Sequence, residues 1–410
     1  MDVTNAFLHG ELDEENYMSL PPGFTPTSGD SLLPNVVCKL RKSVYGLRQA
    51  SRQWYFTFAN VLLAHGFVQS PSDHTMFVKK SDNSFVAMLV YVDDIVIASN
   101  DPLAVDNLKT LLQKNFHIKD LGELKYFLGL EVARSKLGIV VNQRKYCLDL
   151  IADSGFLACK PVSTPLDPGV KLSKDSGECL SDITGYRRLI GRLLYLTITR
   201  PDIAYVVHKL SQFLSCPTAT HLAAAQRVVR YLKSNPGQGL FYFVDSALCL
   251  NVFADADWAS CPDSRRSTSG FCVFMGDSFI SWKAKKQTTV SRSSTEAEYR
   301  SLANATCELI WLHNLLADLH ISLSGPAKLF FDNQSAIHIA TNPVFHERTK
   351  HIEIDCHLVR DKLKAGFLKL MHVHAANQFA DIFTKALQPT IFSSLLSRFN
   401  VSSLFLPNQT

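Results

Sequence analysis

Ser84-Phe-Val-Ala-Met-Leu-Val-Tyr-Val-Asp-Asp-Ile-Val-Ile-Ala-Ser99 is the stretch that decides the fold of the amino-terminal part of this 410-residue chain. Two apolar, β-branched runs flank Asp93-Asp94, which predicts a buried β-hairpin with a tight turn at the two acids. Adjacent carboxylates repel each other, so burying them is costly unless a cation compensates their charge. The pair therefore indicates either a divalent-metal site or an exposed acidic turn.

Amphipathic patterns on the carboxyl side of this hairpin predict a series of helices. Helical spacing of apolar residues is present over 102–115, 143–154, 186–196, 201–214 and 220–234. Residues 160–177 are rich in Pro, Gly and Ser and break this periodicity, which predicts a linker. The last three helices predict a helical middle section.

The carboxyl-terminal part alternates between strand and helix patterns. Strands are predicted over 250–254, 270–275, 279–283 and 328–331, with a long helix over 295–319 and a further helix after the last strand. This alternation predicts an α/β domain.

Length and composition narrow the class of protein. A chain of 45.8 kDa favours about two to three domains, and its net charge of +5 is too small to indicate nucleic-acid binding by itself. The 10 cysteines include no Cys-x-x-Cys pair, which favours reduced thiols in an intracellular protein. The longest apolar stretch, 85–92, is far too short to cross a membrane.

Four acids of the carboxyl-terminal domain stand where predicted strands end or helices begin, namely Asp255, Glu298, Asp332 and Asp381. Each also has an ordinary structural explanation. Glu298 would complete a capping box with Thr295, Asp332 would cap the next helix, and Asp381 would be a first-turn helix acid. Asp257 lies two residues beyond Asp255 on the same strand face and is an alternative to it.

Ordered motifs in the first half of the chain resemble the reverse transcriptase of the copia-type retrotransposon Pol polyprotein. These motifs are Met1-Asp-Val-Thr-Asn-Ala-Phe-Leu-His-Gly-Glu-Leu12, Leu20-Pro-Pro-Gly-Phe24, Tyr45-Gly-Leu-Arg-Gln49, Tyr91-Val-Asp-Asp94 and Lys119-Asp-Leu-Gly-Glu-Leu-Lys-Tyr-Phe-Leu-Gly129. The resemblance implies that Asp2, Asp93 and Asp94 bind two Mg²⁺ ions, which activate the primer 3′-hydroxyl and stabilise the leaving pyrophosphate.

The same resemblance assigns roles to residues around these acids. Phe7 would stack below the sugar of the incoming dNTP, Gln49 would contact the nucleotide, and Arg48 and Arg52 would contact phosphates. A core aromatic in the case of Phe7, and a solvated face in the case of the arginines, remain alternatives.

Motifs in the second half are similar to the RNase H domain of the same family. They are Phe253-Ala-Asp-Ala-Asp-Trp-Ala259, Arg265-Arg-Ser-Thr-Ser-Gly270, Ser293-Ser-Thr-Glu-Ala-Glu-Tyr299, Asp332-Asn333 and Asn377-Gln-Phe-Ala-Asp381. The similarity implies that Asp255, Glu298, Asp332 and Asp381 hold two Mg²⁺ ions, with Mn²⁺ as a possible substitute, and that the RNA strand of an RNA–DNA hybrid is cut. His374 resembles the family's product-release histidine, with an ordinary packed or surface histidine as the alternative.

Basic residues near an aromatic are candidates for contact with the hybrid. Phosphate-seeking cations beside a stacking ring are typical of nucleic-acid binding, whereas a solvated charged strand is the competing explanation. The candidates are Trp282, Lys283, Lys285, Lys286, Arg292, Arg348 and Lys350.

The predicted architecture is α/β (α+β), with the resemblance extending from Asp2 to about Leu387. It comprises a palm and thumb over 1–165 without amino-terminal fingers, a helical connection over 166–245, an RNase H domain with a mixed sheet over 246–390, and a tail over 391–410. The absence of fingers leads us to expect a fragment of a longer Pol protein.

The function implied is a reverse transcriptase fragment with RNase H activity. Its partners would be an RNA template, a DNA primer, the RNA–DNA hybrid and dNTPs, without a membrane. The resemblance places it inside the cell, in a cytoplasmic virus-like particle or the nucleus. The alternative is a catalytically silent, truncated or domesticated nucleic-acid-binding protein.

Overall fold

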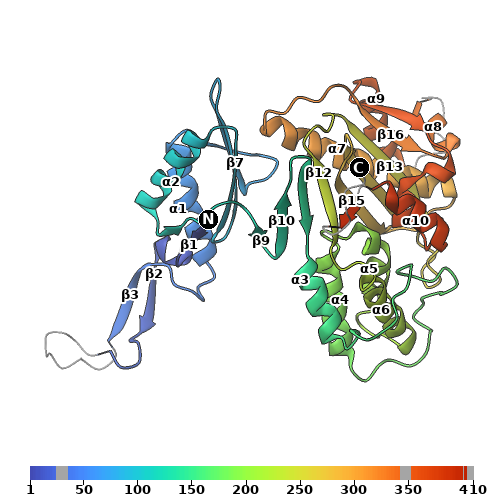
Figure 1. Cartoon of the computed structure of the whole chain (residues 1–410), viewed down its shortest axis with the longest axis horizontal. Coiled ribbons are helices and arrows are strands. Elements are labelled where there is room, and N and C mark those ends of the chain that lie inside the picture. The colour runs from blue at the N-terminus through green and yellow to red at the C-terminus, as the bar shows by residue number, and fades with distance from the viewer. Residues whose placement is uncertain (25–35, 342–351, 400, 404–410) are drawn as a thin grey trace. The chain divides into compact units, whose positions relative to one another are not determined.

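The computed structural model describes residues 1–24, 36–341, 352–399 and 401–403. The chain divides into two compact units, one comprising Met1–Leu128 and Asn314–Ile321, the other Gly129–His313 and Ser322–Thr410. Helices and strands of both units are labelled in Figure 1. Among the described residues, no helix combines the length and the apolar character needed to cross a membrane.

The first unit contains a six-stranded sheet with the order β4-β5-β6-β7-β1-β8. These strands are β1 (Asp2–Val3), β4 (Val68–Gln69), β5 (Met76–Lys80), β6 (Phe85–Tyr91), β7 (Asp94–Ser99) and β8 (Ile118–Lys119). The unit also contains the 3₁₀ helix η1 (Ala6–His9), the paired strands β2 (Glu11–Ser19) and β3 (Val37–Lys42), the helices α1 (Ala50–Ala64) and α2 (Pro102–Asn115), and β9 (Tyr126–Phe127).

One face of this sheet is covered by α1 and α2, because each helix carries apolar residues at four-residue spacing. Trp54, Phe58 and Leu62 of α1 and Leu108 and Leu112 of α2 are all buried in the same core cluster as the strand residues. Helix α2 spans the residues predicted from the sequence, 102–115. It begins where the side chain of Asp101 accepts hydrogen bonds from two backbone N–H groups of the first turn.

The predicted hairpin is present, but its turn lies one residue earlier than expected. Tyr91 pairs with Asp94, so the turn consists of Val92 and Asp93, and Asp94 is the first residue of β7. The carbonyl of Val92 accepts a 2.6 Å hydrogen bond from the indole N–H of Trp54. This contact and the pairing of Asp94 with β1 hold the turn at Val92, even though its φ of 55° is unusual for a β-branched residue.

In the second unit, a mixed five-stranded sheet has the order β15-β14-β13-β16-β17. Its strands are β13 (Leu250–Ala256), β14 (Thr268–Met275), β15 (Ser278–Lys286), β16 (Ala327–Phe331) and β17 (Leu368–His372). The first three are antiparallel neighbours, whereas β16 runs parallel to β13 and to β17. The accompanying helices are α7 (Ser294–Asp318), α8 (Gln334–Thr341), α9 (Glu353–Lys364), the 3₁₀ helices η5 (Ala375–Asn377) and η6 (Phe379–Phe383), and α10 (Pro389–Ser397).

A helical layer and a second sheet complete this unit (Figure 1). The helices are α3 (Arg144–Asp153), α4 (Ile183–Leu196), η2 (Pro201–Ile203), α5 (Ala204–Ser211) and α6 (Ala219–Leu232). The sheet contains β10 (Leu130–Arg134), β11 (Gly138–Asn142), β12 (Gln238–Phe243) and β18 (Val401–Ser403), which pair antiparallel. None of these four strands was predicted, because their apolar runs are short, and β11 and β12 each also contain a glycine.

The core of the second unit is continuous between the helical layer and the mixed sheet. Ile190 of α4, Leu210 of α5 and Val228 of α6 belong to the same buried cluster as Phe274 of β14 and Phe383 of η6. The segment predicted as a linker has no helix or strand, yet Leu166 and Leu172 within it are also buried in this cluster. The helical layer therefore supports the sheet directly.

A disulfide between Cys179 and Cys216 differs from the expectation that all thiols are reduced. Their Cα atoms lie 5.2 Å apart, and Cys179 forms a β-bridge with Thr218. Their sequence separation of 37 residues gave no sign of this contact, because the tertiary fold alone brings the two segments together.

Candidate active sites

The acids of the first unit converge on neighbouring strands. Asp2 in β1 pairs with Asp94 in β7, so that both side chains lie on the same face of the sheet. The carbonyl of Asp93 accepts a 2.8 Å hydrogen bond from the backbone N–H of Val3. Burial raises the pKa of Asp94, and the negative charges of Asp93 and Asp2 act in the same direction. The structure thus brings all three predicted acids together.

The aromatic and basic candidates of the first unit lie on η1 and at the start of α1. Phe7 is half-buried, and its ring centroid is 4.8 Å from that of Tyr45 in the predicted Tyr45–Gln49 motif. Gln49 immediately precedes α1. Arg48 and Arg52 are exposed, and the guanidinium of Arg52 lies 5.3 Å from the ring centroid of Phe56 in the next turn.

Four separate elements position the acids of the second unit. Asp255 is buried in β13, which continues two residues beyond the predicted end, to Ala256. Glu298 lies in the second turn of α7, Asp332 directly follows β16, and Asp381 belongs to η6. Because β13 and β16 are parallel neighbours, their carboxyl ends open at the same edge of the sheet.

The four carboxyl groups lie near enough to influence one another's pKa values. Burial raises the pKa of Glu298 to about 7, with added repulsion from Asp255 and Asp332. Burial also raises the pKa of Asp381 to about 7, and Asp255 again contributes. Desolvation and the charge of Asp255 raise the pKa of Asp332 as well. Such clustered, desolvated carboxyl groups are typical of catalytic and metal-binding sites.

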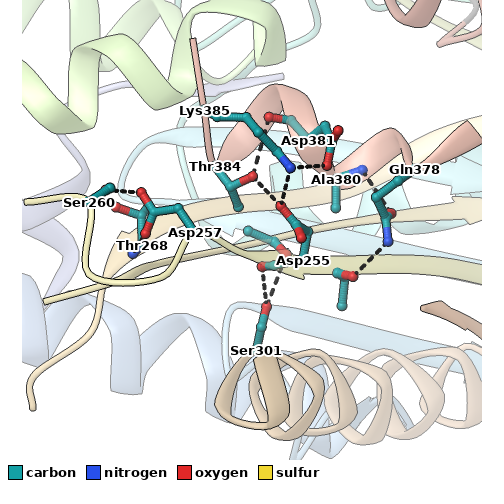
Figure 2. Close-up of polar contacts among 12 residues, drawn as sticks. Asp255, Asp257, Ser260, Thr268, Ser301, Gln378, Ala380, Asp381, Thr384 and Lys385 are labelled. Carbon is teal, nitrogen blue, oxygen red and sulfur yellow. Dashed lines mark hydrogen bonds and ion pairs between the residues drawn. The ribbon is translucent and has the colours of Figure 1, made fainter. Parts of the chain in front are cut away.

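Lys385 lies between two of the acids, as Figure 2 shows. Its Nζ atom is 2.9 Å from Asp381 Oδ1 and 3.4 Å from Asp255 Oδ2. Burial alone would lower the pKa of Lys385, but the charges of Asp255 and Asp381 outweigh it and raise this pKa above its ordinary value. The hydroxyl of Thr384 donates a hydrogen bond to Asp255.

Two further hydrogen bonds fix the backbone around Asp255. The Ser301 hydroxyl of α7 donates to the carbonyl of Asp255 at 2.7 Å and contacts the carbonyl of Gly270 at 3.1 Å. The buried amide of Gln378 donates to the carbonyl of Ala254 at 3.0 Å. Helix α7 and the segment before η6 are thereby attached to opposite sides of the strand that carries Asp255.

Gly270 allows η6 to approach the sheet. A Cβ atom at this position would lie 2.7 Å from Phe383 Cβ and 2.7 Å from Thr384 Cγ2, closer than carbon atoms can pack. Gly270 pairs with Asp255 across β13 and β14. Only a residue without a side chain therefore lets η6 bring Asp381 beside Asp255.

Asp257, the alternative to Asp255, has other partners. One of its oxygens accepts from the Ser260 hydroxyl and the other from the Thr268 backbone N–H, as Figure 2 shows. Asp255 instead faces Thr384 and Lys385. The contacts thus place Asp255 in the acid cluster and Asp257 in the loop that follows β13.

The remaining candidates have varied surroundings. His374 is exposed, and its Nδ1 accepts a 3.3 Å hydrogen bond from the Ala376 backbone N–H. On β15, Lys283 and Lys285 are exposed and alternate with Trp282, whose half-buried ring stacks 5.0 Å from that of Phe279.

The other basic candidates fall into three groups. Lys286 donates a 2.9 Å hydrogen bond from Nζ to the sulfur of Cys261, and Arg292 is exposed. Arg348 and Lys350 lie outside the described residues.

Sequence reasoning missed several residues of this site. Lys385 follows Asp381 by four residues, a spacing that suggests an ion pair. Trp258 is 55% exposed only three residues after Asp255, and its indole N–H donates to the Ser291 carbonyl at 3.2 Å. No sequence signal distinguished the exposed Trp258 from the half-buried Trp282, because their burial depends on the fold.

The donor set suits a hard divalent cation. Carboxylate oxygens are the ligands that Mg²⁺ prefers, and Glu298 Oε2 is buried without a hydrogen-bond partner among the described residues. Within the described part of the chain, no group of three or more His, Cys, Asp or Glu side chains is arranged closely enough to hold a metal ion. The ammonium of Lys385 lies between Asp255 and Asp381 in this arrangement.

Comparison with known proteins identifies the family. A family model described as reverse transcriptase (RNA-dependent DNA polymerase) matches residues 1–168. The retrovirus-related Pol polyprotein from transposon RE1 of Arabidopsis thaliana is 48% identical over 98% of this chain and 27% of its own length. The corresponding protein from transposon TNT 1-94 of Nicotiana tabacum is 36% identical over 94% of this chain and 29% of its own. The chain therefore spans little more than a quarter of these relatives.

A shorter relative is matched over its full length. A putative transposon Ty5-1 protein of Saccharomyces cerevisiae is 34% identical over 75% of this chain and 100% of its own. Among solved structures, the RNase H domain of a Mycobacterium tuberculosis protein is 13% identical, covering 37% of this chain and 98% of that one, with a TM-score of 0.26. A foamy viral protease-reverse transcriptase in complex with double-stranded DNA is 12% identical, covering 91% of this chain and 67% of that one, with a TM-score of 0.20.

The sequence matches agree with the motifs around Asp2, Asp93-Asp94 and Asp255. The prediction of a copia-type Pol relative is confirmed by the family model and by the plant transposon proteins. This chain belongs to the reverse transcriptase family of copia-type retrotransposon Pol polyproteins.

Proposed function

We propose that the second unit is a metal-dependent ribonuclease that hydrolyses the RNA strand of RNA–DNA hybrids. The observation that supports this most strongly is the gathering of Asp255, Glu298, Asp332 and Asp381 from four elements into one electrostatically coupled site. Four clustered carboxylates are destabilising on their own, so they favour a function that uses cations. Family membership supports the same assignment.

The four acids would hold two Mg²⁺ ions, for which Mn²⁺ could substitute. Two bound metal ions supply a hydroxide nucleophile and stabilise the leaving 3′-oxygen. Asp255 is oriented from one side by the Thr384 hydroxyl, and its backbone carbonyl is held by Ser301. The hydrogen bond from Thr384 would favour one orientation of the carboxylate before any substrate binds.

Exposed residues beside the acid cluster would bind the hybrid. Trp258 is exposed in the loop after β13, and its indole N–H donates to the carbonyl of Ser291, the residue that precedes the exposed Arg292. An exposed ring next to an exposed cation suits a nucleotide, whose sugar or base stacks while its phosphate binds the guanidinium. Lys283 and Lys285 add positive charge along β15.

The first unit would carry the polymerase function of the family. Asp2, Asp93 and Asp94 lie side by side and provide oxygen ligands for Mg²⁺. Phe7 would contact the incoming dNTP, and Gln49, Arg48 and Arg52 would contact the nucleotide and phosphates of the template and primer. The family model over residues 1–168 supports this assignment. An intracellular location, in a virus-like particle or the nucleus, would follow from these activities.

A cleavage assay tests the ribonuclease assignment. The full chain is incubated with an end-labelled RNA–DNA hybrid and Mg²⁺, next to double-stranded RNA and double-stranded DNA. We expect cleavage of the RNA strand of the hybrid alone, and its loss in Asp255→Asn and Glu298→Gln. Asp263→Asn, which changes an exposed acid of the loop after β13, is the matched control. Equal cleavage by wild type and both site variants would contradict the assignment.

Primer extension tests the polymerase assignment separately. The full chain should extend a DNA primer on an RNA template with dNTPs and Mg²⁺, and Asp93→Asn should abolish extension without affecting hybrid cleavage. Binding of nucleic acid without any turnover in either assay would instead favour a silent nucleic-acid-binding protein.

A further inference from the structure

Lys385 has an unusual place among the acids of the second unit. Its ammonium forms ion pairs with Asp381 at 2.9 Å and with Asp255 at 3.4 Å, two residues that come from η6 and β13. Its positive charge also acts on Glu298 and Asp332. A single side chain therefore contacts two of the four carboxylates and offsets part of the negative charge of the cluster, as a divalent cation would in this site.

The residues before Lys385 are buried, whereas its own side chain is partly exposed. Thr384 and Phe383, the two preceding residues, are fully buried, and Gly270 admits them closely against the sheet. The Lys385 side chain is 45% exposed, while that of Asp255 is 5% exposed. A flexible four-carbon stem that reaches the acids from the solvent side can withdraw its ammonium without any change in the backbone.

The acid cluster has an incomplete cation environment in this arrangement. Glu298 Oε2 is buried without a hydrogen-bond partner among the described residues, although Lys385 lies close to the other acids. An ammonium donates three hydrogen bonds at most and carries one charge, whereas a divalent ion carries two and accepts more oxygen ligands. The carboxylates would therefore gain by exchanging Lys385 for a metal ion.

We propose that Lys385 is an internal counter-ion, which holds Asp255 and Asp381 in place in the metal-free protein and is displaced when a divalent metal ion binds between them. This inference rests on the proposed metal-dependent function and adds a residue that regulates metal occupancy. Lys385 keeps the four acids from repelling one another before the metal arrives. It also competes with the metal, so it sets the metal concentration at which the site fills.

Direct measurement of metal binding tests the inference without reference to activity. Mn²⁺ binding to the full chain, without nucleic acid, is measured by electron paramagnetic resonance for wild type, Lys385→Met, Lys385→Arg and the control Lys369→Met. Lys369 is exposed on β17, the edge strand of the same sheet. Mn²⁺ binding that depends on Asp255 is isolated by repeating the titrations in an Asp255→Asn background.

Lys385→Met should bind Mn²⁺ about tenfold more tightly than wild type, because a neighbouring charge changes an ionic equilibrium by a factor of about ten or more. Lys385→Arg keeps the positive charge and should bind Mn²⁺ no more tightly than wild type, and Lys369→Met should match wild type. In EDTA, Lys385→Met should melt at a lower temperature than wild type, and saturating Mn²⁺ should remove that difference. Unchanged Mn²⁺ affinity in Lys385→Met, or the same tightening in Lys369→Met, would overturn the inference.

Hybrid cleavage across a Mn²⁺ titration separates this inference from the proposed function. If Lys385 is displaced, the Mn²⁺ concentration that gives half-maximal hybrid cleavage should fall in Lys385→Met by the same factor as the Mn²⁺ dissociation constant. Loss of cleavage at every metal concentration, with unchanged Mn²⁺ affinity, would show that Lys385 stays in the site and acts there, and would overturn displacement. Tighter Mn²⁺ binding by Lys385→Met without hybrid cleavage by any variant would support the counter-ion while contradicting the ribonuclease assignment.

Discussion

Arg200 and Asp202 form an ion pair that is almost completely removed from water, with side chains 2% and 0% exposed. Arg200 Nη2 donates to Asp202 Oδ2 at 2.7 Å, and its Nη1 donates to the carbonyl of Asn235 at 3.0 Å. The hydroxyl of Tyr231 in α6 donates to the same Asp202 oxygen at 2.6 Å. The pair thereby joins the segment before α5 to the end of α6 in the core of the second unit.

Replacing Asp202 should strongly destabilise the second unit. Asp202→Asn leaves the Arg200 guanidinium buried without a compensating charge, which typically costs about 3–5 kcal/mol of the free energy of unfolding. The measurement is urea unfolding followed by circular dichroism. The control is Asp153→Asn, because Asp153 pairs with Arg192 at 2.8 Å but is 66% exposed, and such pairs contribute about 1 kcal/mol or less. Similar losses in both variants would contradict this role of burial.

Removing the Tyr231 hydroxyl should have a smaller effect that depends on Asp202. Tyr231→Phe keeps the ring and removes one hydrogen bond to a charged acceptor, so we expect a loss of about 1.5–3 kcal/mol in the free energy of unfolding. The double variant with Asp202→Asn should lose less stability than the sum of the two single losses, because the hydroxyl has then already lost its charged partner. Strict additivity in this double-mutant cycle would exclude the network.

His208 should make the second unit less stable in acid. Its Nε2 accepts a 2.9 Å hydrogen bond from the Lys286 backbone N–H. Burial lowers the pKa of His208 below 6.5, and the charges of Lys285 and Lys286 act in the same direction. His208 therefore binds a proton more readily in the unfolded chain than in the folded chain. Its contribution to the free energy of unfolding is complete above pH 6.5 and is lost as the pH falls from 6.5 towards the lower pKa of the folded state.

The variant His208→Gln isolates this contribution. Its urea midpoint should fall less than that of wild type between about pH 7.5 and about pH 5. A residual acid-side loss is expected, because burial also lowers the pKa of His221. An identical pH dependence in wild type and variant would contradict the assignment to His208.

Gly270→Ala should displace η6 from the sheet. The added Cβ would meet Phe383 Cβ and Thr384 Cγ2 at 2.7 Å, and overpacking of this kind costs about 1–3 kcal/mol. Because η6 carries Asp381, hybrid cleavage should fall as well. The control is Gly191→Ala in the middle of α4, where an added Cβ has no neighbour within 4 Å. This control should be stabilising by roughly 0.5–1 kcal/mol, as expected for alanine in a helix.

Trp258→Ala should weaken binding of the hybrid. Stacking of a base or sugar on an aromatic ring contributes about 1–3 kcal/mol, so Kd should rise by a factor of roughly 5–150. The Kd is measured by fluorescence anisotropy with a labelled hybrid in the presence of Ca²⁺. Trp258→Phe, which keeps an aromatic ring, should retain most of the affinity of wild type. The control is Trp311→Ala, because Trp311 is also exposed, at 43%. It lies 13 positions beyond Glu298 in α7, which corresponds to about 20 Å along the helix and places it far from the acids. Equal losses in both tryptophan variants would contradict a specific contact.

Local patterns predicted many of the elements. The apolar spacing of α2 and the β-branched runs around Asp93 are read from neighbours in the chain, and the structure contains both elements. The turn was placed one residue late, because Trp54 and β1 fix Val92 and Asp94 through contacts far away in the sequence. Strand β12 was missed for a similar reason, since an entire helical layer separates it in the chain from its pairing partner β11. Strands β10 and β11 pair locally, but their apolar runs are too short to give a clear pattern.

The sequence by itself determined the family, the order of the motifs and the acids that carry the proposed chemistry, because these depend on residue type and spacing along the chain. Only the tertiary structure decided which groups meet. In the folded chain, Asp255 accepts a hydrogen bond from Thr384, whereas Asp257 contacts the backbone of Thr268. Lys385 lies between Asp255 and Asp381. Burial and charge compensation depend on three-dimensional proximity between distant segments, and no local pattern of residues encodes that proximity.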